Sequence, residues 1–156
     1  MKRFLGIFGA VLTSLLVFYL VVASFAQEQA TKEECVARCK IAAELIQKIG
    51  QEEAVEKIND KDGPFVWKDT YVFVFDGSGK ILAHPFPKAI GKVLIDRKDS
   101  NGKLYFREFI QVANTKGEGW VRYTHPKVKG GPPVAKISYI LKVPGENVIV
   151  GAGIWE

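Results

Sequence analysis

The spacing of the apolar positions changes along the chain, and each spacing predicts an element. Between residues 31 and 58 these positions recur every three or four residues, which predicts one long helix with a kink at Gly50. Thr31 is placed to cap this helix, and two glutamates follow in its first turn. The sequence NDKDGPF, residues 59–65, ends it. The apolar stripe of the helix consists of Cys35, Cys39, Ala42, Ile46 and Ile49.

Strand patterns follow the helix. DTYVFVFDGSGKILAHP, residues 69–85, predicts a hairpin whose first strand is apolar on both faces and therefore central in a sheet. LYFREFIQVANTK, residues 104–116, returns to helical spacing and predicts a second, shorter helix. Three further strands are predicted at residues 118–126, 134–143 and 148–155. Consecutive hairpins with helices packed against them predict an α+β domain around an antiparallel sheet.

Composition limits the class of protein. The chain has 156 residues, which suits one domain, and its 47% hydrophobic and 25% charged content is that of a globular protein. The net charge of +5 is scattered without a basic block, which argues against nucleic acid as a partner.

The N-terminus predicts export. Lys2 and Arg3 precede an uncharged apolar run at residues 4–22, and Ser24 and Ala26 fit the small positions of a signal-peptidase site. This predicts a signal peptide over residues 1–26 and a domain over residues 27–156. The alternative is an uncleaved anchor, because about 19 apolar residues can span a bilayer. Both place the domain outside the cytoplasm, either periplasmic or secreted, or tethered to the membrane.

The two cysteines, Cys35 and Cys39, leave several interpretations open. An oxidising compartment favours a disulfide. Positions i and i+4 of a helix have poor geometry for one, so the bond would be strained. The others are that both are small buried apolar residues, or that they pair between two chains.

Five segments together resemble a known family. In order, they lie at residues 71–85 (YVFVFDGSGKILAHP), 90–110 (IGKVLIDRKDSNGKLYFREFI), 117–126 (GEGWVRYTHP), 135–145 (AKISYILKVPG) and 148–155 (VIVGAGIW). They resemble the Cache superfamily, and more narrowly the single-Cache type 2 domain, an extracytoplasmic sensor of bacterial chemoreceptors and histidine kinases. The resemblance covers about residues 31–156. It implies a PAS-like antiparallel sheet of about five strands behind a long N-terminal helix. The given sequence ends without a second membrane segment or signalling domain, as in a solitary Cache protein.

Two basic residues are candidates for ligand contact. Lys136 lies among apolar residues on a predicted central strand, where an unpaired lysine is rare, so a ligand carboxylate is an attractive counter-ion. The alternatives for Lys136 are an exposed edge position or a pair with Glu118. The resemblance places His84, in the sequence AHP, at the sensory pocket. There it would either donate a hydrogen bond to an anionic ligand or, bound to a backbone carbonyl, fix the loop at residues 85–92.

Aromatic residues complete the predicted site. The hydroxyls of Tyr123 and Tyr139 are candidate donors to a carboxylate, although either ring could be ordinary core. Lys136 and Tyr139 are three residues apart, so a regular strand points them to opposite faces, and both line one pocket only if the strand bulges. Candidate aromatic walls, with core packing as the alternative, are Tyr71, Trp67 and Trp120.

These observations predict a binding module rather than an enzyme. The sequence lacks a recognisable catalytic constellation, a metal-binding cluster or a phosphate loop, and DSNG, residues 99–102, lacks the calcium-loop spacing. We therefore expect no cofactor and no metal. The predicted function is sensory binding of a small organic molecule, such as a short carboxylate, in signal transduction or chemotaxis. The alternative is an interaction protein with a vestigial pocket, which forms a homodimer or docks on a membrane receptor or kinase through its N-terminal helix.

Overall fold

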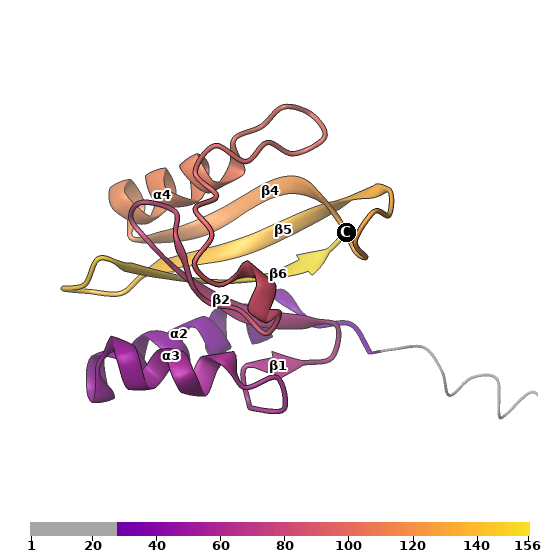
Figure 1. The fold of residues 1–156 in the computed structure, drawn as a ribbon. Helices are drawn as coiled ribbons and strands as arrows, with labels where there is room; N and C mark the ends of the chain where they lie inside the picture. The colour runs from indigo at the N-terminus through magenta and orange to yellow at the C-terminus, as the bar shows by residue number, and fades with distance from the viewer. Residues whose placement is uncertain (1–27) are drawn as a thin grey trace, which may run out of the picture.

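Three layers make up the fold of the computed structural model, which describes residues 28–156 (Figure 1). Helices α2 and α3 cover one face of an antiparallel sheet, and helix α4 covers the other (Figure 1). The predicted signal peptide or anchor lies outside the described residues and stays a prediction. The α+β class predicted from the sequence is confirmed.

The helix predicted as one piece over residues 31–58 is two helices, α2 (Lys32–Ile49) and α3 (Gln51–Asn59). Gly50 separates them with a φ of 84°, a conformation that glycine adopts without steric cost. The start of α2 is a capping box, as Thr31 accepts a hydrogen bond from the Glu34 N–H and the Glu34 carboxylate accepts one from the Thr31 N–H at 2.9 Å.

The sheet has six strands where about five were expected. They are β1 (Val66–Trp67), β2 (Thr70–Asp76), β3 (Ile81–Ala83), β4 (Glu118–Pro126), β5 (Pro133–Lys142) and β6 (Val148–Trp155). Their order is β1-β2-β6-β5-β4, with β3 paired to β2. The unforeseen strand is the two-residue β1, which is too short to show alternation. Strand β2 is interior, as its two apolar faces predicted.

Alternation along the strands divides the core in two. The face under α2 and α3 carries Val72, Val74, Tyr139, Val150 and Ala152. The opposite face carries Phe73, Phe75, Tyr123, Ile140 and Ile149, which pack with residues of α4 (Tyr105–Lys116). The segment between β3 and α4 also packs on this second face, through Ala89 and Leu94 (Figure 1). It contains the 3-10 helix η1 (Pro87–Ala89).

The cysteines lie in the core under α2. Cys35 and Cys39 are fully buried free thiols in this structure, as in the interpretation that treats both as small apolar residues; pairing within or between chains stays a prediction. Burial raises the pKa of Cys35 to about 12 and that of Cys39 well above its ordinary value. A buried thiol with a raised pKa supplies little thiolate, so both side chains should be inert toward thiol reagents in the native protein.

Candidate functional site

Lys136 is buried on β5, an interior strand of the sheet. On β5 it is the register partner of Tyr123 on β4 and of Trp155 on β6, and its side chain points to the α4 face. The residue is only 3% exposed. Its Nζ lies 4.4 Å from the centroid of the Trp155 ring and 5.2 Å from that of Tyr71. Two aromatic faces therefore stabilise the ammonium in part, through cation–π interactions.

Within residues 28–156, no carboxylate forms an ion pair or hydrogen bond with Lys136. Glu118, the partner considered from the sequence, instead accepts a hydrogen bond from the Tyr139 hydroxyl on the α2 side. Burial lowers the pKa of Lys136 to about 8, while the charge of the Asp69 carboxylate opposes the shift. At neutral pH the amine is thus mostly a buried cation that lacks an anion among these residues.

His84 follows β3 and faces the same region. Its ring centroid lies 4.7 Å from that of Tyr71. Its backbone N–H donates to the side-chain oxygen of Asn59 at 2.8 Å, and its Nδ1 accepts the Phe86 N–H at 3.1 Å. The ring therefore fixes the start of the following loop, as one interpretation predicted, but through an N–H rather than a carbonyl. Because Nδ1 is an acceptor, the proton of the neutral ring is on Nε2, which is left as a donor.

Tyrosines and a second histidine surround these two side chains. The Tyr105 and Tyr123 rings stack at 4.5 Å with an interplanar angle of 9°, and the Tyr123 hydroxyl lies 3.1 Å from that of Ser138. The His125 ring lies 6.2 Å from that of Trp155. We call these residues the Lys136 cluster; its members are Tyr71, His84, Tyr105, Tyr123, His125, Lys136 and Trp155.

Three residues predicted to line the site lie elsewhere. Strand β5 keeps its register from Lys136 to Tyr139 without a bulge, so Tyr139 faces α2, where its ring contacts Trp120 at 5.4 Å. Trp67 also packs on that side, with the Arg38 guanidinium 4.8 Å from the centroid of its ring. The alternation that turns Lys136 toward one face thus turns Tyr139 to the other, and the structure does not bring Tyr139, Trp67 and Trp120 into the cluster.

A shallow pocket of about 170 Å³ opens beside the cluster. Tyr105 and His125 belong to both the cluster and the pocket wall. Asp99 shapes the covering loop, because its carboxylate accepts hydrogen bonds from the backbone N–H groups of Asn101, Lys103 and Thr124. The complete lining is Arg97, Lys98, Asp99, Ser100, Tyr105, Thr124, His125, Pro126, Gly131 and Pro133. This volume is below the usual range for drug-sized ligands and suits a small molecule.

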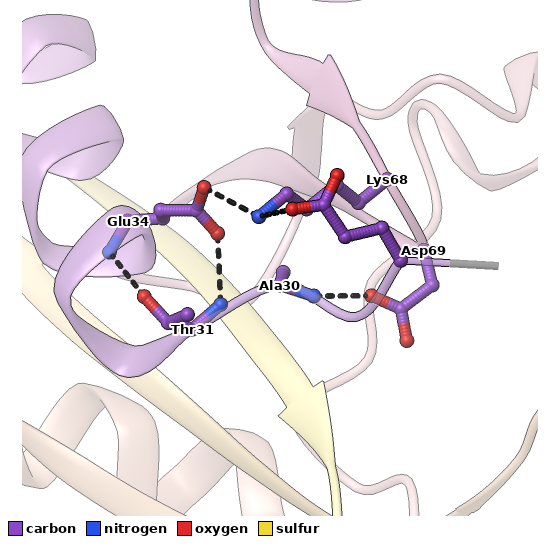
Figure 2. A network of polar contacts seen from close by, with 6 residues as sticks. Ala30, Thr31, Glu34, Lys68 and Asp69 are labelled. Atoms are coloured by element: carbon purple, nitrogen blue, oxygen red, sulfur yellow. Dashed lines mark hydrogen bonds and ion pairs between the residues drawn. The ribbon is translucent and has the colours of Figure 1, made fainter. Parts of the chain in front are cut away.

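A polar network fixes the strand that carries Tyr71 (Figure 2). The Ala30 N–H donates to Asp69 at 2.8 Å, and Lys68 Nζ pairs with Glu34 at 2.8 Å and with Glu28 at 2.9 Å. Lys68 has a φ of 48°, a left-handed conformation at the turn between β1 and β2. The network thus ties the start of α2 to the residues just before β2, the strand that carries Tyr71.

Three members of the cluster were missed from the sequence. His125 is two residues after Tyr123 on the same strand, so strand alternation alone could have predicted that it faces the site. Trp155 meets Lys136 only through the register of β5 with β6, and Tyr105 arrives from α4. The spacing of residues along the chain does not reveal either of these contacts.

The two histidines should make the protein acid-sensitive. Burial, reinforced by the charge of Lys136, lowers the pKa of both His84 and His125 from 6.5 to about 4. The folded state thus binds fewer protons than the unfolded state between these values, so stability present above pH 6.5 is lost as the pH falls toward 4. We expect the melting temperature to fall over this window, and to fall less in a His84→Gln/His125→Gln variant. Equal acid sensitivity of both proteins would contradict this.

Comparison with known proteins agrees with the geometry. The Single Cache domain 2 family matches residues 20–156. The methyl-accepting chemotaxis protein CtpM of Pseudomonas aeruginosa is 32% identical over 90 residues, which are 56% of this chain and 16% of that receptor. The chain therefore spans only a small part of the receptor's length.

Solved structures share the fold. A Cache chemosensory domain described for its carboxylic acid recognition aligns with a TM-score of 0.68 and 24% identity, over 79% of this chain and 91% of that one. A periplasmic sensor domain of a chemotaxis protein gives 0.59 and 26%, over 79% and 88%. A methyl-accepting chemotaxis protein from Vibrio parahaemolyticus gives 0.66 and 22%, over 80% and 87%.

Cache domains of chemotaxis receptors are extracytoplasmic sensors that bind ligands rather than catalyse reactions. Across residues 28–156, no helix has the length and apolar character needed to cross a membrane. The same part of the chain holds no group of three or more His, Cys, Asp or Glu side chains arranged to bind a metal ion. The family match and the six-stranded antiparallel sheet agree with the resemblance found in the sequence, and the chain belongs to the Single Cache domain 2 family.

Proposed function

We propose that this Cache domain is an extracytoplasmic sensor that binds a short organic acid at the Lys136 cluster. The observation that carries the proposal is the Lys136 ammonium, 3% exposed and without a carboxylate partner among residues 28–156. A buried cation without an anion is unfavourable, and a bound carboxylate removes that cost. The domain would act in the periplasm, in secreted form, or tethered to the membrane.

The groups around Lys136 suit a carboxylate. The Nε2–H of His84 is a neutral donor on the same face of the sheet, and the hydroxyls of Tyr123 and Ser138, which share one hydrogen bond, leave one further O–H free to donate. With its pKa lowered to about 4, His84 stays neutral at physiological pH, so it would donate a hydrogen bond without adding a second buried charge. The rings of Tyr71 and Trp155 would enclose the short carbon chain.

The related structure that recognises carboxylic acids points in the same direction. At 24% identity it supports the fold, so the case for a carboxylate here depends on Lys136 itself. Because the chain spans 16% of the matched chemoreceptor, transfer of the signal to a membrane receptor or kinase stays a prediction, as does a homodimer.

The alternative function, docking through the N-terminal helix, has less support. Docking on a partner would require the apolar stripe of the helix to be exposed. In the structure, however, the stripe residues Cys35, Cys39, Ala42 and Ile46 pack against the sheet. Ile41, at 55% exposed, is the one large hydrophobic residue of α2 that is strongly exposed.

Calorimetric titration of the full chain tests the proposal. Acetate, propionate, lactate and pyruvate are compared with the neutral amides acetamide, propionamide and lactamide. A carboxylate that pairs with Lys136 raises the pKa of the amine from about 8, so binding at pH 8 should take up roughly half a proton. The heat at pH 8 should therefore depend on the ionisation enthalpy of the buffer, and much less so at pH 6. Absence of binding by every acid, or equal binding of acids and amides, would refute the proposal.

A further inference from the structure

An exposed apolar patch lies in the segment that follows β3. Of the five large hydrophobic side chains that are strongly exposed within residues 28–156, three belong to this segment. Phe86 is 63% exposed, Ile90 38% and Val93 57%. We call these three residues the 86–93 patch. Their closeness in an eight-residue stretch sets them apart from single exposed hydrophobics, which are common on protein surfaces.

The patch is held in a defined shape. The Ile81 N–H donates to the Lys92 carbonyl at 2.9 Å, and the Gly91 N–H donates to the Ile81 carbonyl at 2.8 Å. Pro85 is buried, and Ala89 and Leu94 pack on the core of the α4 face of the sheet. Other residues of the segment therefore anchor it, and Phe86 adds ring contacts with Tyr71 and His84 while most of its side chain stays exposed.

Positive charge surrounds the patch. Lys80, Lys88 and Lys92 are exposed, and none of them forms an ion pair with another described residue. Residues 77–95 contain no aspartate or glutamate. The Asp76 carboxylate, which accepts the Lys80 backbone N–H at 3.1 Å, lies at one end of this stretch, so the surface combines apolar side chains with an excess of positive charge. Its complement is an anionic surface that also accepts apolar groups.

We propose that the 86–93 patch docks on the surface of an anionic phospholipid bilayer. Phe86, Ile90 and Val93 would enter the boundary between headgroups and acyl chains, and the three lysines would lie among the lipid phosphates. A bilayer is favoured over an acidic protein because the apolar run at residues 4–22 directs the chain to a membrane, whether as signal or anchor. Flexible lysine stems also match mobile phosphates better than a fixed partner surface.

Docking would place the bilayer beside the ligand site. The Phe86 ring lies 5.7 Å from that of Tyr71 and 5.4 Å from that of His84, both members of the Lys136 cluster. The inference does not depend on the proposed ligand, since the docking surface consists of the exposed parts of Phe86, Ile90 and Val93 together with the three lysines.

A site-specific fluorophore tests the docking in the full chain. The buried, high-pKa thiols of Cys35 and Cys39 allow an Ile90→Cys variant to be labelled selectively with an environment-sensitive dye, with wild type as the labelling control. The protein is reconstituted in vesicles of phosphatidylcholine alone or mixed with phosphatidylglycerol. A label at Glu44→Cys, exposed on α2 across the sheet, is the matched control.

We expect a blue shift at position 90 that requires phosphatidylglycerol and weakens as salt is added. Replacing Lys80, Lys88 and Lys92 by glutamine should lower the ratio of docked to undocked protein, followed by this shift, by roughly fivefold for each lysine. The same change at Lys40, Lys48 and Lys116, also exposed, should leave it unaltered. Overturning results are an absent shift, an equal shift in both vesicle types, an equal shift at position 44, or a shift that appears only when a second protein is added.

Discussion

Lys136→Met should abolish carboxylate binding while the fold stays intact. Removal of one partner of a desolvated charge pair typically costs about 2–5 kcal/mol, which corresponds to a roughly 30- to 5,000-fold weaker affinity. Methionine keeps most of the length and the apolar stem of the lysine, so the Tyr71 and Trp155 rings keep a packing partner. Calorimetric titration with whichever acid binds the wild-type protein measures the loss.

The ligand-free variant should be at least as stable as wild type at neutral pH. The pKa of Lys136 is depressed from 10.5 to about 8, so the fold favours the neutral amine. Stability present above pH 10.5 is lost as the pH falls through 8, which means that at pH 7 the buried ammonium destabilises the fold. Its removal should therefore leave the melting temperature unchanged or raise it.

Two further variants test the site: Lys142→Met controls for the loss of a positive charge, and His84→Ala removes a second proposed ligand contact. Lys142→Met removes a lysine from the same strand and face, six residues away and hydrogen-bonded to Asn114, so it should bind the acid normally. His84→Ala should weaken binding by about 1–3 kcal/mol, the cost of one buried polar contact. If Lys136→Met binds like wild type, or if its affinity falls only together with its melting temperature, Lys136 is a structural residue and the ligand site lies elsewhere.

Strand alternation explains why part of the site was visible in the sequence. Lys136 lies between apolar neighbours on β5, and both its burial and its central strand were predicted correctly. The same period of two already placed Tyr139 on the opposite face, so its assignment to the site depended on a bulge that β5 does not have. Tyr71, His84 and Tyr123 were predicted site residues that do meet at Lys136.

Other contacts depend on quantities that a single sequence does not contain. Trp155 reaches Lys136 only because β6 pairs with β5 in one register among several that its apolar pattern allows. Trp120 lies three residues before Tyr123, so alternation already placed it on the opposite face, whereas Trp67 lies in the two-residue strand β1, which is too short to show its face. The sequence predicted a kink at Gly50. The structure has a full break between two helices there, because Gly50 adopts a φ of 84°, and the sequence alone does not show which backbone conformation a glycine adopts.

Packing of α4 holds the tyrosine walls of the site, and Phe109 is at its centre. The side chain is 1% exposed, and its ring centroid lies 5.3 Å from that of Tyr123 and 5.6 Å from that of Tyr105. It also meets Phe73 and Phe75 on β2, each at 6.1 Å. Phe109→Ala would therefore leave a cavity between helix and sheet, directly behind the stacked pair of tyrosines.

We expect Phe109→Ala to lower the free energy of unfolding by about 3–5 kcal/mol, the usual cost of such a truncation in a core. This is a large part of the roughly 5–15 kcal/mol that stabilises an ordinary domain. Phe86→Ala deletes the same atoms from a 63% exposed position and is the matched control, with an expected loss below about 1 kcal/mol. Urea unfolding of the full chain, followed by tryptophan fluorescence, measures both. A loss at Phe109 as small as the one at Phe86 would mean that α4 does not hold the tyrosine wall as described, because the energy of a core contact would then be missing at Phe109.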